Sequence, residues 1–180
     1  MPVIRTERLE LVPATEHLLS AALESPTALS SVLGARVPAT WPPEFLDAPA
    51  LQFARDRLTG SPEAGGWWMY FILLPRDAGD RTLIGSAGYK GPPAEDGTVE
   101  VGYGIVTDHQ RRGYASETVR GLVKRAFDLP QVRRVIAETY PELTPSIGVL
   151  RKCGFELTGE GSEPGVIRFE LTRRAYGGEV

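Results

Sequence analysis

Residues 102–116, with the sequence GYGIVTDHQRRGYAS, combine small and basic residues where a strand pattern gives way to a helix pattern. The first turn of a helix presents unpaired backbone N–H groups and the positive end of the helix dipole. Gly113 and Ala115 are small enough to let a phosphate approach the backbone. Arg111 and Arg112 add positive charge at the same turn. We therefore predict an anion site, most simply for a pyrophosphate, and the alternative is a tight turn with solvated arginines.

Two common phosphate-binding motifs do not match this stretch. No Gly-Lys-Ser or Gly-Lys-Thr follows the glycines, so the stretch is not a P-loop. The glycine spacing and the preceding strands also differ from the dinucleotide-binding fingerprint. The predicted ligand is therefore a phosphate-bearing molecule of another kind.

The rest of the sequence predicts an α/β fold that holds this turn. Alternating or continuous apolar runs predict strands, and apolar residues at helical spacing predict helices. Expected strands cover residues 8–12, 67–74, 83–90, 98–106, 132–139, 155–158 and 166–171. Expected helices cover residues 15–23, 51–60, 113–127 and 144–154. Residues 25–49 are rich in proline and are expected to be irregular, and residues 77–81 are expected to form a hairpin turn.

The helix expected over residues 144–154 carries signals at both of its ends. Thr144 suits the N-cap, and Pro145 suits the first helical position. Gly154 suits a left-handed C-cap, and Phe155 follows as its hydrophobic contact.

Composition limits the class of protein. The chain has 180 residues, a formal net charge of −3, one cysteine, two histidines and 42% hydrophobic residues. We expect a single domain over residues 1–180, because this length can bury a core without disulfides or metals. A disulfide framework, a metal site, a membrane span and a signal peptide are not expected, so the default location is the cytoplasm. Nucleic acid is disfavoured because the chain is acidic and its basic residues are scattered.

Charge is unevenly distributed along the chain. Residues 1–110 carry 8 basic and 14 acidic residues, whereas residues 111–180 carry 12 basic and 9 acidic residues. This asymmetry is either ordinary surface charge or a local site for an anionic ligand in the second half.

Four runs of residues resemble known motifs, in order along the chain. Gln110-Arg111-Arg112-Gly113-Tyr114-Ala115 is similar to the Q/R-x-x-G-x-G/A signature of the GNAT superfamily of acyl-CoA N-acyltransferases. The branch that contains the ribosomal-protein alanine acetyltransferases has an opening similar to residues 6–9 (TERL). Its third and fourth strands resemble residues 83–85 and 100–103, and its closing helix resembles residues 146–155 (SIGVLRKCGF). The resemblance spans roughly residues 6–171.

The resemblance implies a single-domain α/β fold whose mixed, mostly antiparallel central sheet is flanked by helices. It implies that the sheet splays between the fourth and fifth strands and that acetyl-CoA, without a metal, binds in the wedge. The pantetheine arm would pair with backbone around Ile105 and Val106. Leu143 replaces an asparagine common in the branch, so one side-chain hydrogen bond to the pantetheine is lost. The pyrophosphate would meet the backbone of Arg111, Arg112, Gly113, Tyr114, Ala115 and Ser116.

The implied chemistry is direct attack of an amine on the acetyl thioester. Glu100 shares a strand face with Gly102 and Gly104, so it is the candidate base, directly or through water. Its alternative role is a surface carboxylate, and the alternative for the glycines is a structural bulge. Many members of the superfamily place a tyrosine acid where this chain has Leu150. The branch instead implies Ser146 as the acid, and the alternative is a first-turn hydroxyl bonded to the backbone.

We therefore expect an acetyl-CoA-dependent N-acetyltransferase that acts on a small amine or a protein N-terminus. A CoA-binding sensor without turnover is the alternative that Leu143 and Leu150 favour, and a scaffold without a CoA site is the third. A homodimer is left open. Residues 41–43 and 67–68 line an acceptor pocket or belong to the core. We expect Cys153 to be a buried thiol, and His17 and His109 to lie on the surface.

Overall fold

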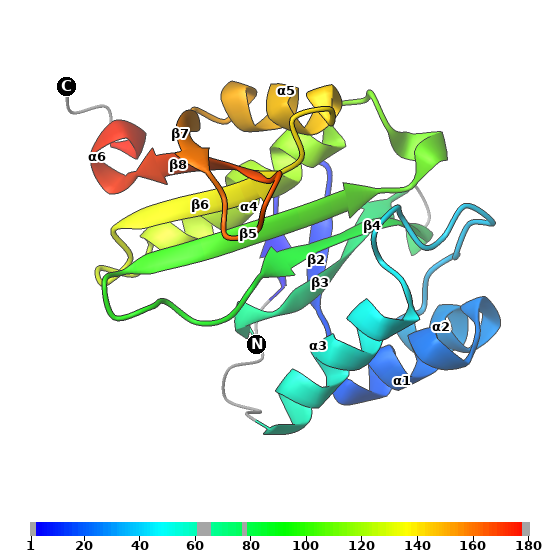
Figure 1. Cartoon of the computed structure of the whole chain (residues 1–180). Coiled ribbons are helices and arrows are strands. Elements are labelled where there is room, and N and C mark those ends of the chain that lie inside the picture. Colours follow the sequence, from blue (N-terminus) through cyan, green and yellow to red (C-terminus); the bar gives the residue numbers. More distant parts are fainter. Residues whose placement is uncertain (1–2, 61–65, 77–78, 178–180) are drawn as a thin grey trace.

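Eight strands form one mixed sheet in the computed structural model, which describes residues 3–60, 66–76 and 79–177 (Figure 1). The strand order is β1-β2-β3-β4-β5-β6-β8-β7. The strands are β1 (Ile4–Arg5), β2 (Glu10–Pro13), β3 (Met69–Pro75), β4 (Arg81–Tyr89), β5 (Thr98–Ile105), β6 (Arg134–Thr139), β7 (Glu156–Glu160) and β8 (Ile167–Thr172). Neighbours pair antiparallel except β5 and β6, which are parallel and are joined through a helix, as a parallel pair requires.

The sheet splays between β5 and β6. These strands pair over only three positions, Thr98 with Arg134, Val99 with Val135 and Glu100 with Ile136. Beyond Glu100, β5 continues to pair with β4 as far as Ile105, while β6 continues with β8 as far as Thr139. The two halves of the sheet therefore separate in a wedge that begins at Glu100. This confirms the splay expected between the fourth and fifth strands, because the two-residue β1 shifts the numbering by one.

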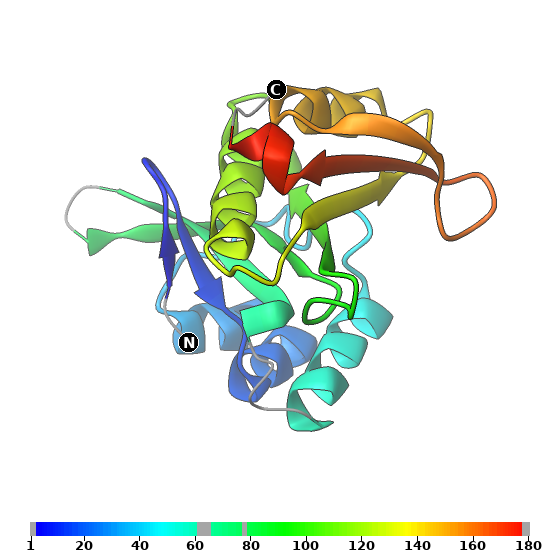
Figure 2. The same ribbon diagram turned by 90° about the vertical axis from the view of Figure 1, so that its left-hand side faces the viewer.

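Helices cover both faces of the sheet (Figures 1 and 2). They are α1 (Glu16–Glu24), α2 (Pro26–Leu33), α3 (Ala48–Gly60), α4 (Tyr114–Phe127), α5 (Thr144–Lys152) and α6 (Arg173–Tyr176), with a 3₁₀ turn, η3, at Thr107–His109. One core cluster lies between α4 and the sheet, and it includes Tyr70 and Ile72. The other lies under α1, α2 and α3, and it includes Phe71 and Leu73. Alternate residues of β3 thus enter opposite cores, which explains why its sequence is a continuous apolar run.

The structure corrects two expectations about helices. Residues 26–33 form α2, although we expected residues 25–49 to be irregular. Ser25 caps α2 by accepting a hydrogen bond from the N–H of Ala28 at 3.0 Å, and Pro26 occupies its first turn, where a proline needs no N–H partner. The N-cap of α5 is Leu143, not Thr144. The left-handed cap at Gly154 is confirmed by its φ of 86°, and Phe155 is buried.

Other differences lie at the ends of the chain and at one turn. The sequence indicated neither β1 nor α6, which are short. Residues 77–78 of the expected hairpin turn lie outside the described residues. Within the described ranges, no helix is long and apolar enough to cross a membrane.

Candidate functional site

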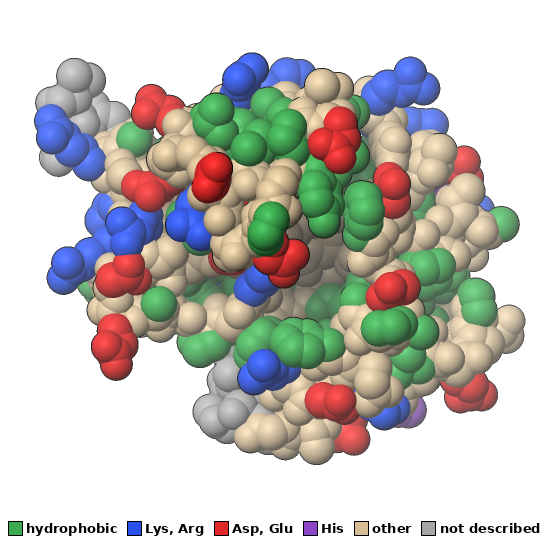
Figure 3. All heavy atoms as spheres, viewed as in Figure 1, with side chains coloured by type: hydrophobic (Ala, Val, Ile, Leu, Met, Phe, Trp, Pro, Cys, Tyr) green, Lys and Arg blue, Asp and Glu red, His purple; other side chains and the backbone are tan. Residues whose placement is uncertain are grey.

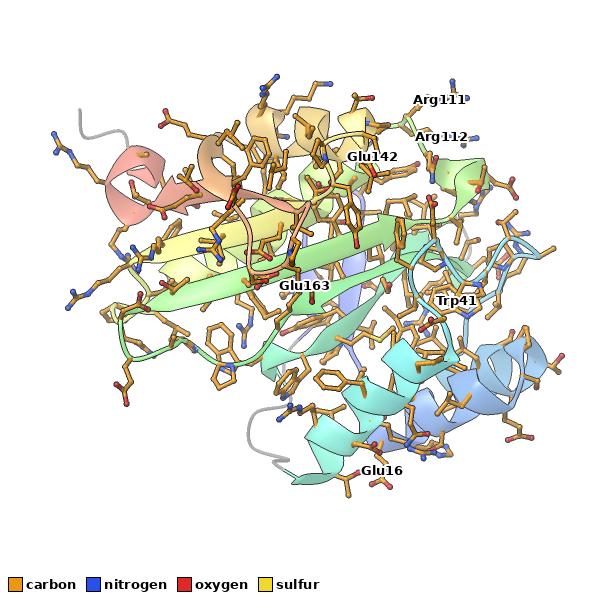
Figure 4. The ribbon with its side chains drawn as sticks, viewed as in Figure 1. Glu16, Trp41, Arg111, Arg112, Glu142 and Glu163 are labelled. Carbon is orange, nitrogen blue, oxygen red and sulfur yellow. The ribbon has the colours of Figure 1, made fainter. Side chains whose placement is uncertain are left out.

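The N-terminus of α4 lies at the end of a tightly held loop that follows β5. Gly113, the N-cap, has a left-handed φ of 83°, which glycine adopts without strain. No side chain caps the helix there, so the first N–H groups of α4 remain available to an anion. The Gln110 side chain fixes the loop by donating from Nε2 to the carbonyl of Ile105 at 2.9 Å. Arg111 and Arg112 are exposed beside this helix start, as Figure 4 shows.

The turn between β1 and β2 anchors the start of α4. The Glu117 carboxylate accepts hydrogen bonds from Thr6 Oγ1 at 2.5 Å and from the backbone N–H and Nε of Arg8, both at 2.7 Å. Arg8 also donates from Nη1 to the carbonyl of Arg112 at 3.1 Å. Burial alone would raise the pKa of Glu117, but the hydrogen bonds from Thr6 and Arg8 outweigh it and hold that pKa below its ordinary value. Residues 6–9 thus brace the predicted anion site.

A cavity of about 390 Å³ opens beside the start of α4. It is lined by Glu7, Arg8, Gly113, Ser116, Glu117, Arg120 and Lys152. Because Glu117 is paired with Arg8, the cations Arg120 and Lys152 give the cavity wall toward α5 its charge. Sequence reasoning missed Arg8, Arg120 and Lys152. The spacing of residues 113, 116, 117 and 120 on one helix face was the available signal.

Beyond Glu100, one backbone edge of β5 faces β4 and the other faces the wedge. The carbonyl of Glu100 accepts a hydrogen bond from the N–H of Lys90, and the N–H of Val106 donates to the carbonyl of Ile84. These groups therefore face β4. Because bonding directions alternate along a strand, the backbone groups of Tyr103 and Ile105, beyond the last pair with β6, point into the wedge. The carbonyl of Ile105 accepts a hydrogen bond from Gln110, which leaves the N–H of Ile105 as its backbone donor toward the wedge.

Glu100 lies at the last pair of the parallel ladder, where the wedge begins. Its carboxylate forms an ion pair with the Lys90 ammonium, and its side chain is 19% exposed. The alternative of a structural bulge at Gly102 and Gly104 is not what the structure shows, because β4 and β5 pair in continuous register from Val101 to Ile105. A Cβ on Gly104 would lie 3.2 Å from Pro43, so Gly104 lets the segment before α3 approach the strand.

The side chain of Tyr103 lies on the face of β5 opposite to that of Glu100, and it reaches α5. Its hydroxyl lies 3.1 Å from both the carbonyl and Oγ of Ser146. Burial raises the pKa of Tyr103 to about 12, so the phenol stays protonated at neutral pH. The hydrogen-bond partner of Ser146 Oγ is therefore the side chain of Tyr103, whereas the alternative role of this hydroxyl was a bond to the backbone. Sequence reasoning missed Tyr103, because its partner lies 43 positions away.

The burial and contacts of four other residues singled out in the sequence are as follows. Leu143 is half-buried at the start of α5, and Leu150 lies in the core. Cys153 is half-buried, and its Sγ donates to the carbonyl of Ser116 at 3.4 Å. Burial raises the pKa of the Cys153 thiol, which keeps it protonated as expected of a structural cysteine. Trp41 is buried against Phe71, with ring centroids 5.9 Å apart, so it belongs to the core.

The prediction that His109 is a surface residue is wrong. The η3 turn directs its ring inward, where it is 6% exposed and its centroid lies 6.5 Å from that of Tyr114. Burial and, secondarily, Arg112 lower the pKa of His109, so its neutral form is favoured. His17 is exposed, as predicted. Among the described residues, no group of three or more His, Cys, Asp or Glu side chains could hold a metal ion.

The face in front of β5 is hollowed (Figure 3). Glu142, which precedes α5, lies on the side of this face toward α5, and Glu163, from the loop between β7 and β8, lies in front of β5 (Figure 4). Trp41 comes from the opposite side, from the segment between α2 and α3.

A splayed mixed sheet beside an uncapped helix start agrees with the fold expected of a GNAT-type acetyltransferase. The chain matches the acetyltransferase (GNAT) domain over residues 8–156 and therefore belongs to this family of enzymes. It is 27% identical over 164 residues to the uncharacterized N-acetyltransferase YjdG of Bacillus subtilis (strain 168), covering 91% of this chain and 95% of the relative.

Two solved structures share the fold. RimL, a ribosomal α-N-protein acetyltransferase solved with coenzyme A, aligns with a TM-score of 0.67 at 19% identity, over 97% of this chain and 99% of RimL. The aminoglycoside acetyltransferase AAC(6')-Ib, solved with ribostamycin and coenzyme A, aligns with a TM-score of 0.65 at 22% identity, over 95% of this chain and 97% of that enzyme.

Proposed function

We propose that this chain transfers the acetyl group of acetyl-CoA to a primary amine by direct attack in a ternary complex. The wedge that begins at Glu100 and ends beside the start of α4 carries this proposal. One end of the wedge offers an uncapped helix N-terminus for a pyrophosphate. The other end offers a carboxylate where an amine would react.

Acetyl-CoA fits the wedge from the helix start inward. The backbone of residues 111–116 takes the pyrophosphate, and Arg111 and Arg112 add exposed charge. The wedge-facing backbone of Tyr103 and Ile105 pairs with the pantetheine arm. Arg120 and Lys152 in the cavity beside α4 suit a further phosphate of the same ligand. Leu143 supplies an apolar contact and no side-chain hydrogen bond.

The reaction needs an amine without its proton and a stabilised leaving group. The amine nitrogen attacks the thioester carbonyl carbon, the carbon–sulfur bond breaks, and CoA leaves as the thiolate. Glu100 accepts the proton that the amine loses, and Ser146 donates a hydrogen bond to the thiolate. The base matters more for a lysine amine, with a reference pKa of ~10.4, than for an α-amine at ~7.7–8.0.

An acceptor screen tests the proposal. We would measure thiol release from acetyl-CoA with amino acids, polyamines, aminoglycosides and peptide N-termini, and we would confirm each product by mass. Peptide N-termini and aminoglycosides should be tested first, because the structural neighbours RimL and AAC(6')-Ib are named as acetyltransferases of these two classes. We expect acetylation of at least one class by the wild type and none by Gly113→Asp, which blocks the pyrophosphate site.

A CoA-binding module without turnover is the second candidate. It is favoured by Leu150, which lies in the core where many superfamily members carry a tyrosine acid. If CoA raises the melting temperature but no acceptor is acetylated, this second function replaces the first. If CoA causes no shift at all, both are wrong.

A further inference from the structure

Two hydroxyl groups meet across the wedge, one from β5 and one from α5. Tyr103 Oη lies 3.1 Å from Ser146 Oγ and 3.1 Å from the carbonyl oxygen of Ser146. Tyr103 follows the point where β5 and β6 separate, on the strand edge whose backbone faces the wedge. The pair therefore lies between the strand that would guide the pantetheine arm and the helix that would approach its thiol.

The geometry allows two hydrogen-bond arrangements. In the first, Tyr103 donates to the Ser146 carbonyl, and the Ser146 hydroxyl donates back to the phenol oxygen. In the second, Tyr103 donates to Ser146 Oγ, so the Ser146 hydrogen is left to donate to a third group. The first arrangement engages the Ser146 hydrogen with the phenol, whereas the second leaves it free to donate to a sulfur atom.

We propose that Tyr103 is a positioning residue that orients the Ser146 hydroxyl toward the sulfur of CoA, an inference that rests on the proposed function. When the carbon–sulfur bond breaks, the sulfur keeps the electron pair and Ser146 Oγ donates a hydrogen bond to it. Neither hydroxyl gives up its proton, and the thiolate finally takes a proton equivalent to the one that the amine loses. Tyr103 remains a donor throughout, because its burial keeps the phenol protonated.

Turnover in a double-mutant cycle tests whether the two residues act as a unit. We expect Ser146→Ala to lower kcat by about 10²-fold, the effect of removing one donor from a developing anion. Tyr103→Phe should lower kcat by at least 10-fold, and the double variant should be no slower than Ser146→Ala, because coupled residues are not additive. KM for acetyl-CoA should change little. Ser146→Thr, which keeps a hydroxyl, should restore most of the rate.

Tyr89→Phe is the matched control. Tyr89 lies on the neighbouring strand β4, and its buried hydroxyl likewise donates to a backbone carbonyl, that of Leu122 at 2.7 Å. Removing this hydroxyl costs a comparable hydrogen bond that does not involve Ser146. We expect Tyr89→Phe to leave kcat unchanged even where it lowers the melting temperature as much as Tyr103→Phe does.

The ionisation of bound CoA gives a readout that needs no acceptor. We would follow the pKa of the CoA thiol by the ¹³C shift of its cysteamine carbons in the complex. The wild type should lower it by about 1 unit from its value in free CoA, because a hydrogen bond to the thiolate favours the charged form. Tyr103→Phe, Ser146→Ala and the double variant should all return it to the same higher value.

The outcomes separate the two proposals. If the Tyr103→Phe complex keeps the wild-type thiol pKa, or if losses in kcat are additive, Tyr103 does not position Ser146, and acetyl transfer by the wild type still stands. If no acceptor is acetylated but the thiol pKa responds as expected, the proposed transfer fails and the Tyr103 inference holds. If CoA does not bind, both fail.

Discussion

Replacing Glu117 by glutamine should destabilise the fold by about 1–2 kcal/mol, because it removes the charge that holds Arg8 at the start of α4. Glutamine has nearly the same shape and can still accept from Thr6 Oγ1 and from the Arg8 N–H. Its amide nitrogen, however, would face Arg8 Nε, which now donates to Glu117 Oε2 at 2.7 Å. The change therefore breaks one charged hydrogen bond and sets two donors against each other.

The magnitude follows from the exposure of the two side chains. A hydrogen bond to a charged group contributes roughly 1.5–3 kcal/mol when it is well buried. The Glu117 side chain is 13% exposed but that of Arg8 is 43% exposed, so solvent screening reduces the effect. A loss of 1–2 kcal/mol corresponds to a fall in melting temperature of roughly 2–8 °C for a chain of this size.

The pH dependence identifies the charge as the cause. Because folding lowers the pKa of Glu117, its contribution is fully present above the unfolded carboxyl pKa of about 4.3 and is lost as the pH falls through the lower folded value. Urea unfolding of the wild type and Glu117→Gln should therefore differ at pH 7 and converge toward pH 3. Asp128→Asn is the control, because its pair with Lys124 on the same helix is exposed and should contribute less than about 0.5 kcal/mol. An equal difference at both pH values would refute the reasoning.

Three further predictions concern the site. CoA at ~100 times its Kd should stabilise the wild type by ~2.7 kcal/mol in a thermal-shift assay, and Gly113→Asp should abolish this shift, whereas Gly113→Ala, which adds a Cβ but no charge, should keep part of it. Lys152→Ala should weaken CoA binding more than dephospho-CoA binding in calorimetry, mostly at low salt; equal losses would mean that Lys152 meets no phosphate. Glu100→Gln should lower turnover ~10²-fold at neutral pH with unchanged CoA affinity, and the deficit should shrink as the pH rises; wild-type turnover throughout would remove Glu100 from the mechanism.

Local patterns predicted much of the fold because they report burial directly. The periodicity of residues 113–127 follows the face of α4 that packs on the sheet, where Val119, Leu122 and Ala126 are buried. Strand β3 is an apolar run because both of its faces are covered. By contrast, α2 was missed because Pro38, Pro42 and Pro43, which follow it, led us to expect that the whole of residues 25–49 is irregular. The Ser25 cap makes Pro26 a residue of the first turn.

The missed parts of the site depend on contacts between distant segments. The brace on α4 joins Arg8 to Glu117, which are separated by 109 positions, and Tyr103 meets Ser146 across 43 positions. No periodicity reports such pairs. The burial of His109 likewise follows from a 3₁₀ turn that its own neighbours do not signal. Motif spacing located the helix start, but only the packed structure shows what holds it.

Glu100 forms an ion pair with Lys90 in the absence of substrate, and this pairing affects how tightly a cationic acceptor binds. A protonated acceptor must approach the same carboxylate, so it competes with the Lys90 ammonium, whose side chain is 63% exposed. An exposed ion pair contributes about 0.2–1 kcal/mol, so Lys90→Met should lower the KM of a cationic acceptor by roughly 1.5- to 5-fold and leave CoA affinity unchanged. Steady-state kinetics would measure this effect, with Lys124→Met as the control for loss of a lysine elsewhere. A higher KM in Lys90→Met would mean that Lys90 holds Glu100 in position for the acceptor instead of competing with it.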